Sequence, residues 1–525
     1  MYYCAGMMEN SPEMSNGMRG TELAGVVDSS HNIDGQVMED QISSADKITY
    51  ESGSASLKYV FDCWPPHGIV GSCLTWTILV LLVWGAAIAI IGLSALPGGN
   101  IFSLMCLFCI AVLGGQLATL AKLPSLMGML VVGILLSSVP GINYVGNSID
   151  KDWSSALRNI ALVVILLRAG LGLDPAALKE LSFMVLRLAF TPCIVETITV
   201  ATVTHLLLGF PWLWGLMLGF ILSAVTPAVI VPCMIKLSEE GYGMDKGIPT
   251  LVIAASSVDD VLAISGFGVL MGITFAKGSL WWIILKGPIE VVMGLVYGLG
   301  VGALLWVLPN IEERNAHNLR FFLLGSAGLL AVFGSQMCLQ AQFGGAGALG
   351  CLVMAFVAGI GWRRQGMSED NNPVDDKLLI MWELFQPFLF SLIGAEIRVS
   401  ELDIRTVGWG LVTLAVGLVF RMTTSFLVVM GGNLNIKERM FVALAWLPKA
   451  TVQAAIGSQA LDFAQKSEAG PEIIRLGEQV LTITVLVILI TAPLGAAAIM
   501  LSAPKLLTKG KTKDTLDLPD GLPDP

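Results

Sequence analysis

Long apolar runs separated by short polar stretches fill the chain from residue 71 onward. A helix of about 20 residues crosses a bilayer core of about 30 Å, so each run predicts a transmembrane helix. Fourteen such segments are predicted, at 71–96, 101–121, 124–139, 155–173, 180–209, 211–236, 248–275, 281–308, 318–341, 343–363, 377–398, 406–432, 438–461 and 477–503. The pattern indicates an all-α polytopic membrane protein of about 14 transmembrane helices.

The composition agrees with this pattern and separates the tails from the membrane domain. Of 525 residues, 55% are hydrophobic and only 13% are charged, against roughly 25% charged in an average soluble domain. Residues 1–68 are polar, without amphipathic periodicity, which predicts a disordered N-terminal tail. Residues 69–503 are expected to form the membrane domain, and residues 504–525 a short C-terminal tail.

Basic residues are distributed unequally between the two sides of the predicted bundle. Lys and Arg resist translocation more than acidic residues do. With a cytoplasmic N-terminus, the inner loops hold Lys122, Lys179, Lys236, Lys246, Arg314, Arg320, Arg363, Arg364, Lys377, Lys437 and Arg439, and the outer loops only Lys151, Lys277, Arg398, Arg405, Lys466 and Arg475. Both termini are therefore predicted to be cytoplasmic, and nothing in the tails distinguishes a plasma membrane from an endolysosomal or mitochondrial one.

The net charge of −10 lies largely in the N-terminal tail, where residues 1–60 hold nine acidic and three basic residues. The charge therefore says little about the transported substrate. Neither tail has the Gly-rich signature of a nucleotide-binding domain. We expect secondary transport driven by a gradient, with no cofactor and no nucleic-acid partner.

Two proline-containing segments seven spans apart predict broken helices. The sixth span contains SAVTPAVIVP, with Thr226 and Pro227, and the thirteenth contains LAWLPKATVQAAIG, with Pro448. A proline removes a helix hydrogen bond and clashes with the preceding turn. One span earlier in each half lies a charge, Glu196 or Arg421. Because seven is odd, such repeats run in opposite directions, which predicts two inverted seven-helix repeats with crossed broken helices.

Two adjacent carboxylates, Asp259 and Asp260, lie in the middle of the seventh apolar run. An ionisable side chain at the bilayer centre costs at least about 2.5 kcal/mol, so the pair requires a reason. Adjacent helix positions differ by about 100°, so the two side chains face different directions. One aspartate is expected to pair with Arg421 or Lys449 and the other to face a cavity; the sequence leaves open which does which.

The carboxylate that faces the cavity can hold either a proton or an alkali cation. Burial favours the protonated form of a carboxyl group, whereas a nearby cation favours the ionised form. Thr226 and the carbonyl groups of the first break supply neutral oxygens, which suit a hard cation, and Lys449 beside the second break offsets the negative helix ends. Competition for one site becomes exchange if only the occupied site crosses the membrane.

The DD pair, the TPA break, the GAE of the eleventh span and WLPKATVQAAIGS together resemble the cation/proton antiporter superfamily. In particular, residues 70–505 resemble the animal NHA-type sodium/proton exchangers, solute carrier family 9B. The resemblance implies exchange of Na⁺ or Li⁺ for H⁺, an elevator-like movement and a homodimer in membrane lipid. It also implies a dimer scaffold at 71–139 and 281–363 and an ion-binding core at 155–275 and 377–503.

The resemblance also assigns roles to single residues. It implies ion-site aspartates at Asp259 and Asp260, a basic residue opposite them at Arg421, a crossing-helix lysine at Lys449, and an acidic partner for the arginine at Glu196. This chain departs from the family where it reads VTP, because many relatives carry an aspartate beside that threonine. The stoichiometry therefore does not carry over.

Other classes of protein also carry buried acids. An intramembrane aspartyl protease needs two carboxylates about 3 Å apart sharing a proton, which adjacent helix residues do not provide. The residues therefore favour a transporter over an enzyme. An organic-anion symporter or a cation channel on the same inverted-repeat scaffold remains open.

Overall fold

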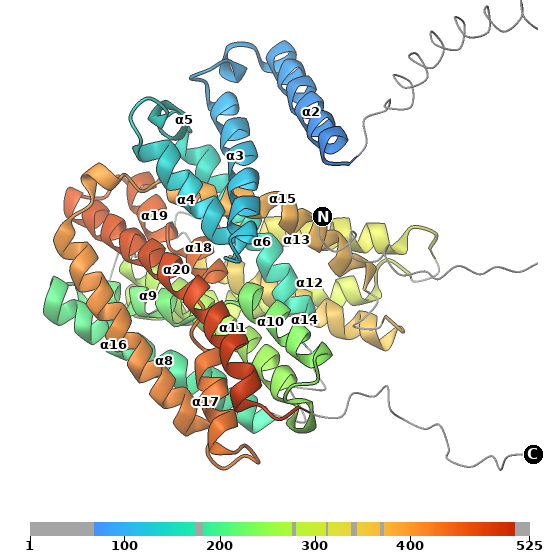
Figure 1. Cartoon of the computed structure of the whole chain (residues 1–525), viewed down its shortest axis with the longest axis vertical. Coiled ribbons are helices and arrows are strands. Elements are labelled where there is room, and N and C mark those ends of the chain that lie inside the picture. Colours follow the sequence, from blue (N-terminus) through green and yellow to red (C-terminus); the bar gives the residue numbers. More distant parts are fainter. Residues whose placement is uncertain are drawn as a thin grey trace, which may run out of the picture. The chain divides into compact units, whose positions relative to one another are not determined.

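The computed structural model describes residues 68–173, 182–275, 280–310, 313–337, 344–367 and 372–509, which are almost entirely helical (Figure 1). The chain divides into two compact units, Met1–Val83 and Trp84–Pro525. In the first unit the structure describes the beginning of one helix. The predicted N-terminal tail lies outside the described residues apart from Gly68, and the predicted C-terminal tail lies outside them beyond residue 509.

The described residues form helices of very different lengths. In chain order they are α2 (Gly68–Ile91), η1 (Gly92–Ala95), α3 (Asn100–Leu120), α4 (Ser125–Ser138), α5 (Asn143–Asn147), α6 (Lys151–Leu171), α8 (Ser182–Leu208), α9 (Trp212–Ser223), α10 (Pro227–Glu239), η2 (Met244–Lys246), α11 (Ile248–Thr274), α12 (Leu280–Val307), α13 (Ala316–Met337), α14 (Gly344–Arg364), α15 (Pro373–Ala395), η3 (Val399–Glu401), α16 (Ile404–Val428), α17 (Ile436–Ala445), α18 (Thr451–Ile456), α19 (Gln459–Lys466) and α20 (Pro471–Leu506).

Each predicted span is largely helical where the structure describes it, apart from the breaks in the sixth and thirteenth, but not every span is long enough to cross a bilayer. Twelve spans within the described residues are long and apolar enough to cross a membrane. The third predicted span is α4, which has only 14 residues. The thirteenth is divided into α17, α18 and α19. An all-helical, multi-pass membrane fold is confirmed, whereas the count of fourteen spans stays a prediction.

Local sequence explains where several helices begin. Asp150, Asn372 and Asp403 precede α6, α15 and α16, and each side chain accepts a hydrogen bond from a backbone N–H in the first turn. Asn435 and Glu438 form a reciprocal capping box at the start of α17. The Arg405 backbone N–H, which donates to Asp403, also holds the pKa of the exposed Asp403 carboxyl below its usual value. These caps fix the helix ends in the loops.

Corresponding helices of the two predicted repeats make corresponding contacts. α4 packs against α15 as α14 packs against α6, and α3 packs against α15 as α13 packs against α6. In chain order α3, α4 and α6 hold the same places in the first half as α13, α14 and α15 hold in the second. Such an exchange of partners is what a two-fold relation between the halves produces.

Two glycines allow α4 and α15 to cross at backbone contact. A Cβ atom added at Gly133 would lie 2.0 Å from the Ser391 carbonyl oxygen, and one added at Gly394 would lie 2.2 Å from the Leu130 carbonyl oxygen. Small residues at such crossings let membrane helices approach closely. The predicted repeats are therefore joined through a contact that tolerates no side chain.

Gly133→Ala is expected to lower the thermal unfolding midpoint of the purified protein in detergent. The added methyl group meets backbone rather than a flexible side chain, and overpacking of this kind costs about 1–3 kcal/mol. Gly408→Ala in α16 is the matched control, because a Cβ atom there meets nothing within 4 Å. Equal midpoints for the two variants would contradict the close crossing of α4 and α15.

Candidate ion-binding site

Both predicted breaks are present. α9 ends at Ser223 and α10 begins at Pro227, with Ala224 and Thr226 in extended conformations between them. α17 ends at Ala445 and α18 begins at Thr451, so that Pro448 lies within the gap. A proline disfavours helical geometry at the residue before it, which explains why α10 starts at Pro227. By contrast, α10 continues through Pro232.

The two breaks are joined directly by hydrogen bonds, so the interrupted helices cross. The Thr226 backbone N–H donates to the Pro448 carbonyl at 3.1 Å. The Thr226 hydroxyl lies 2.7 Å from the Thr451 hydroxyl and accepts from the Thr451 N–H at 3.1 Å. The Gln453 amide donates to the Ala224 carbonyl at 2.6 Å. These contacts satisfy backbone groups that an interruption in hydrocarbon would leave exposed.

Four charged side chains beside the crossing form a continuous buried network. Arg421 on α16 donates to Glu196 on α8 at 2.6 Å and to Asp259 on α11 at 2.9 Å. Lys449, in the second break, lies 2.8 Å from Glu196. All four side chains are at most 1% exposed. The predicted pairing of Glu196 with Arg421 is therefore present, and Asp259 is the aspartate that meets the basic partner.

The same basic side chains also meet the carbonyl ends of the two interrupted helices. Lys449 donates to the carbonyl of Leu222, one residue before the end of α9. Arg421 donates to the carbonyl of Trp446, which follows α17, at 3.2 Å. Cations at helix C-termini offset the partial negative charge of the free carbonyls. The Val225 N–H in the first break donates to Asp259 at 2.9 Å.

Asp260 differs from its neighbour. Its side chain is 1% exposed, and among the described residues it forms no ion pair, while its Oδ1 has no hydrogen-bond partner. The Oδ1 of Asp259 and the Oε1 of Gln453 are also buried without a partner in the described part of the chain. Buried oxygens of this kind are costly unless something bonds to them. Their lone pairs are free of any hydrogen-bond donor in the described part of the chain.

Sequence reasoning missed Gln453 and Thr451. Both belong to WLPKATVQAAIG, and the signal that identifies them is their position immediately after the break, where a side chain can reach the opposite interrupted helix. The sequence predicts the Thr226 hydroxyl as a cation ligand, whereas both of its contacts in the structure go to Thr451. Its role as a ligand stays a prediction.

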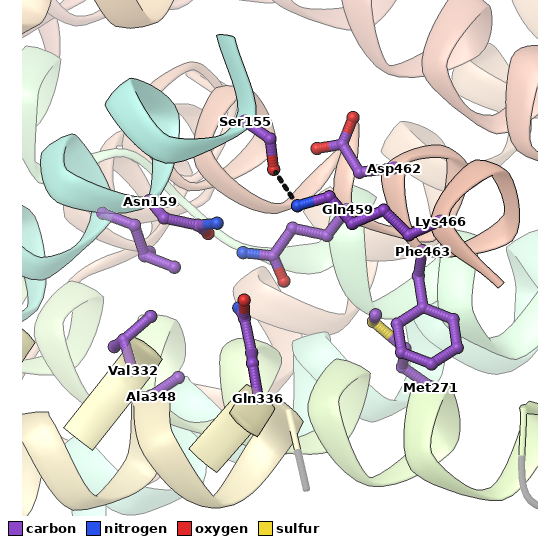
Figure 2. Close-up of a pocket in the computed structure, with 11 residues that line it drawn as sticks. Ser155, Asn159, Met271, Val332, Gln336, Ala348, Gln459, Asp462, Phe463 and Lys466 are labelled. Carbon is purple, nitrogen blue, oxygen red and sulfur yellow. Dashed lines mark hydrogen bonds between the residues drawn. The ribbon is translucent and has the colours of Figure 1, made fainter. Parts of the chain in front are cut away.

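A cavity of about 230 Å³ opens elsewhere in the bundle. It lies between α6, α11, α13, α14 and α19, and Figure 2 shows the amides of Asn159, Gln336 and Gln459 converging across it. Met271 lines it, eleven residues beyond Asp260 on α11, which is about 16 Å along a helix. The two aspartates do not line this cavity.

Known proteins resemble this chain over most of its length. The family profile described as the transmembrane sodium/hydrogen exchanger matches residues 104–501. Sodium/hydrogen exchanger 9B2 of Xenopus tropicalis is 47% identical over 459 residues, covering 86% of this chain and 83% of that protein. Human sodium/hydrogen exchanger 9B2 is 45% identical with the same coverage, and human 9B1 is 40% identical over 85% of each chain.

The fold also resembles a solved antiporter. The structure of the sodium proton antiporter MjNhaP1 from Methanocaldococcus jannaschii at pH 8 superposes with a TM-score of 0.64 at 20% identity, covering 78% of this chain and 98% of that one. The family profile and the 9B relatives confirm the resemblance to family 9B drawn from the DD pair and WLPKATVQAAIGS. This multi-pass membrane protein belongs to the sodium/hydrogen exchanger family.

Proposed function

We propose that this protein exchanges Na⁺ or Li⁺ for H⁺ across a membrane, and that Asp260 is the residue for which the two compete. The observation that carries the proposal is that Asp260 is a buried carboxylate with no basic partner among the described residues. The names of its relatives support Na⁺ and H⁺ as the exchanged ions.

The charges around the crossing support a monovalent occupant. Glu196 and Asp259 carry two negative charges, and Arg421 and Lys449 carry two positive charges, so these four residues balance. Asp260 adds one uncompensated negative charge. A single Na⁺, Li⁺ or H⁺ neutralises it, and a neutral site is the form that crosses a low-dielectric barrier at least cost.

The same balance of charges predicts the stoichiometry of exchange. If Lys449 keeps its proton throughout the cycle, one metal ion leaves for each proton that arrives, and no net charge moves. Asp259 Oδ1, on the adjacent residue, and Gln453 Oε1, just after the second break, are buried without a hydrogen-bond partner among the described residues. Both are hard donors that suit an alkali cation. Asp260 and Asp259 are therefore the proposed Na⁺ or Li⁺ ligands.

An elevator-type movement fits the way in which the helices are joined. The two interrupted helices are hydrogen-bonded to each other and tied by ion pairs to α8, α11 and α16, so they move together. We assign the moving core to 155–275 and 377–503 and the dimer scaffold to 71–139 and 281–363. The homodimer, the cytoplasmic position of both termini and the lipid contacts are parts of this proposal.

The proposal is tested with the purified full-length protein in liposomes that contain a pH-sensitive dye. Addition of Na⁺ or Li⁺ outside is expected to drive protons out of the lumen, and solid-supported membrane electrophysiology is expected to show no transient transport current when the cation is added. Cation flux without proton movement would identify a channel. Proton-independent flux that requires an added organic anion would identify a symporter, and either result would overturn the exchange.

A further inference from the structure

A further buried carboxylate lies away from the crossing. Glu290, on α12, is fully buried. Its Oε2 accepts a hydrogen bond from the backbone N–H of Gly345 at 3.2 Å, and its Oε1 has no partner within the described part of the chain. Gly345 is the second residue of α14, so the carboxylate faces the free N–H groups of a helix N-terminus.

Glu290 also touches α11, the helix that carries the two aspartates. A Cβ atom added at Gly272 on α11 would lie 2.2 Å from Glu290 Oε1, and one added at Gly268 would lie 2.5 Å from the Cα atom of Gly345. α11 therefore passes the carboxylate and the start of α14 at backbone distance. In the proposed elevator movement, α11 belongs to the core, and α12 and α14 belong to the scaffold.

Few charged groups face Glu290. Lys286 lies one turn away on α12 and exerts the nearest opposing charge. The other titratable residues of the packed helices lie farther along them. These are Tyr297 on α12, Cys351, Arg363 and Arg364 on α14, Asp259 and Asp260 on α11, and His317 and Arg320 at the far end of α13. The ionised form of Glu290 thus depends on Lys286 and the α14 N-terminus.

The cavity of Figure 2 lies close to this contact along α11 and α14. Met271 lies next to Gly272 on α11, Ala348 lies three residues after Gly345 on α14, and both line the cavity. The cavity is also lined by amide and charged side chains, and its volume accommodates several water molecules. The cavity thus comes within one residue of the Glu290 contact along α11 and within one turn of it along α14.

We infer that Glu290 is a second proton-binding residue, separate from Asp260, and that its protonation permits α11 to move past α12 and α14. This inference rests on the proposed elevator movement. An ionised Glu290 accepts a hydrogen bond from α14 while its second oxygen lies against the Gly272 backbone of α11, so displacement of α11 would disturb the surroundings of a buried charge. Protonation at Oε1 removes that charge.

The test is exchange of radiolabelled Na⁺ against unlabelled Na⁺ in liposomes, with saturating Na⁺ and equal pH on both sides. Because no proton is carried, competition at Asp260 does not enter the rate. The wild-type rate is expected to fall as pH rises and Glu290 ionises, whereas Glu290→Gln, which is always neutral, keeps its rate. The exchange rate of Glu290→Gln divided by that of the wild type then grows by up to about tenfold for each unit by which the pH rises.

Lys286→Gln provides an independent variant that retains the carboxylate. Loss of the lysine favours the protonated form of Glu290, so the fall in rate is expected at a higher pH than in the wild type. Rates for both variants that parallel the wild type at every pH would overturn the inference while leaving the exchange function intact. Failure of the wild type to exchange Na⁺ at all would instead reject the proposed function.

Discussion

Asp260→Asn abolishes cation-driven proton movement in liposomes, reducing it to the rate of protein-free vesicles. Asparagine keeps the size of the side chain but removes the one carboxylate of the site that lacks a basic partner among the described residues. Loss of a charge that binds the substrate directly costs on the order of 3 kcal/mol, which is about a hundredfold in affinity. The measurement is the initial rate of dye response to Na⁺ or Li⁺.

Two further variants show whether that loss is specific. Asp376→Asn, an exposed carboxylate in the first turn of α15, is the matched control and is expected to exchange like the wild type. Asp259→Asn is expected to reduce thermal stability more than Asp260→Asn, because it leaves Arg421 with one carboxylate fewer. Full exchange by Asp260→Asn would show that another residue carries the cation.

Arg421→Gln is expected to destabilise the protein more than any other single substitution in the network. Arg421 neutralises Glu196 and Asp259 and caps the carbonyl end of α17, and removing it leaves buried carboxylates that Lys449 alone cannot balance. Breaking a buried ion pair by removing one partner costs about 3–5 kcal/mol. The unfolding midpoint in detergent and the yield of monodisperse protein measure this loss.

The origin of that loss is tested by a control and a rescue. Arg405→Gln is the control, because it lies on the same helix and is exposed. Adding Asp259→Asn to Arg421→Gln is expected to restore part of the midpoint, since it removes the carboxylate that loses its basic partner, whereas Glu196 keeps Lys449. An unchanged midpoint for Arg421→Gln, or no gain from the second substitution, would show that the network does not stabilise the fold.

Some features of the site could be predicted from sequence because their causes are local. Pro227 and Pro448 interrupt their helices through steric effects that depend on the chain itself, and their recurrence seven spans apart predicts the crossing. The length of apolar runs likewise predicts the helices. Where a span is short or divided, as in α4 and in α17 to α19, length alone cannot establish whether it crosses the membrane.

The assignment of the two aspartates could not be predicted in the same way. Adjacent residues on a helix point about 100° apart, so the assignment depends on how α11 is rotated against α16. That rotation is set by tertiary packing, which places Asp259 against Arg421 and leaves Asp260 without an ion-pair partner in the described residues. The roles of Gln453 and Thr451 depend on the same crossing.

The charge pairs between distant helices were predicted only in part. The corresponding repeat positions of Glu196 and Arg421 predict their pairing, and the structure brings them to 2.6 Å. Lys449 contacts Glu196 rather than an aspartate, a choice that the sequence leaves open. The proposed function of Glu290 depends on its contact with Gly272, which no pattern within α12 reveals.

Calorimetric titration of the purified protein with Na⁺ at a series of pH values tests competition at Asp260 most directly. A proton and a cation that share one carboxylate require that Na⁺ binding release a proton, and that the apparent affinity weaken as pH falls, approaching about tenfold per pH unit. Asp260→Asn should remove both effects. Sodium binding with the same affinity at every pH and no released proton would contradict the proposed competition.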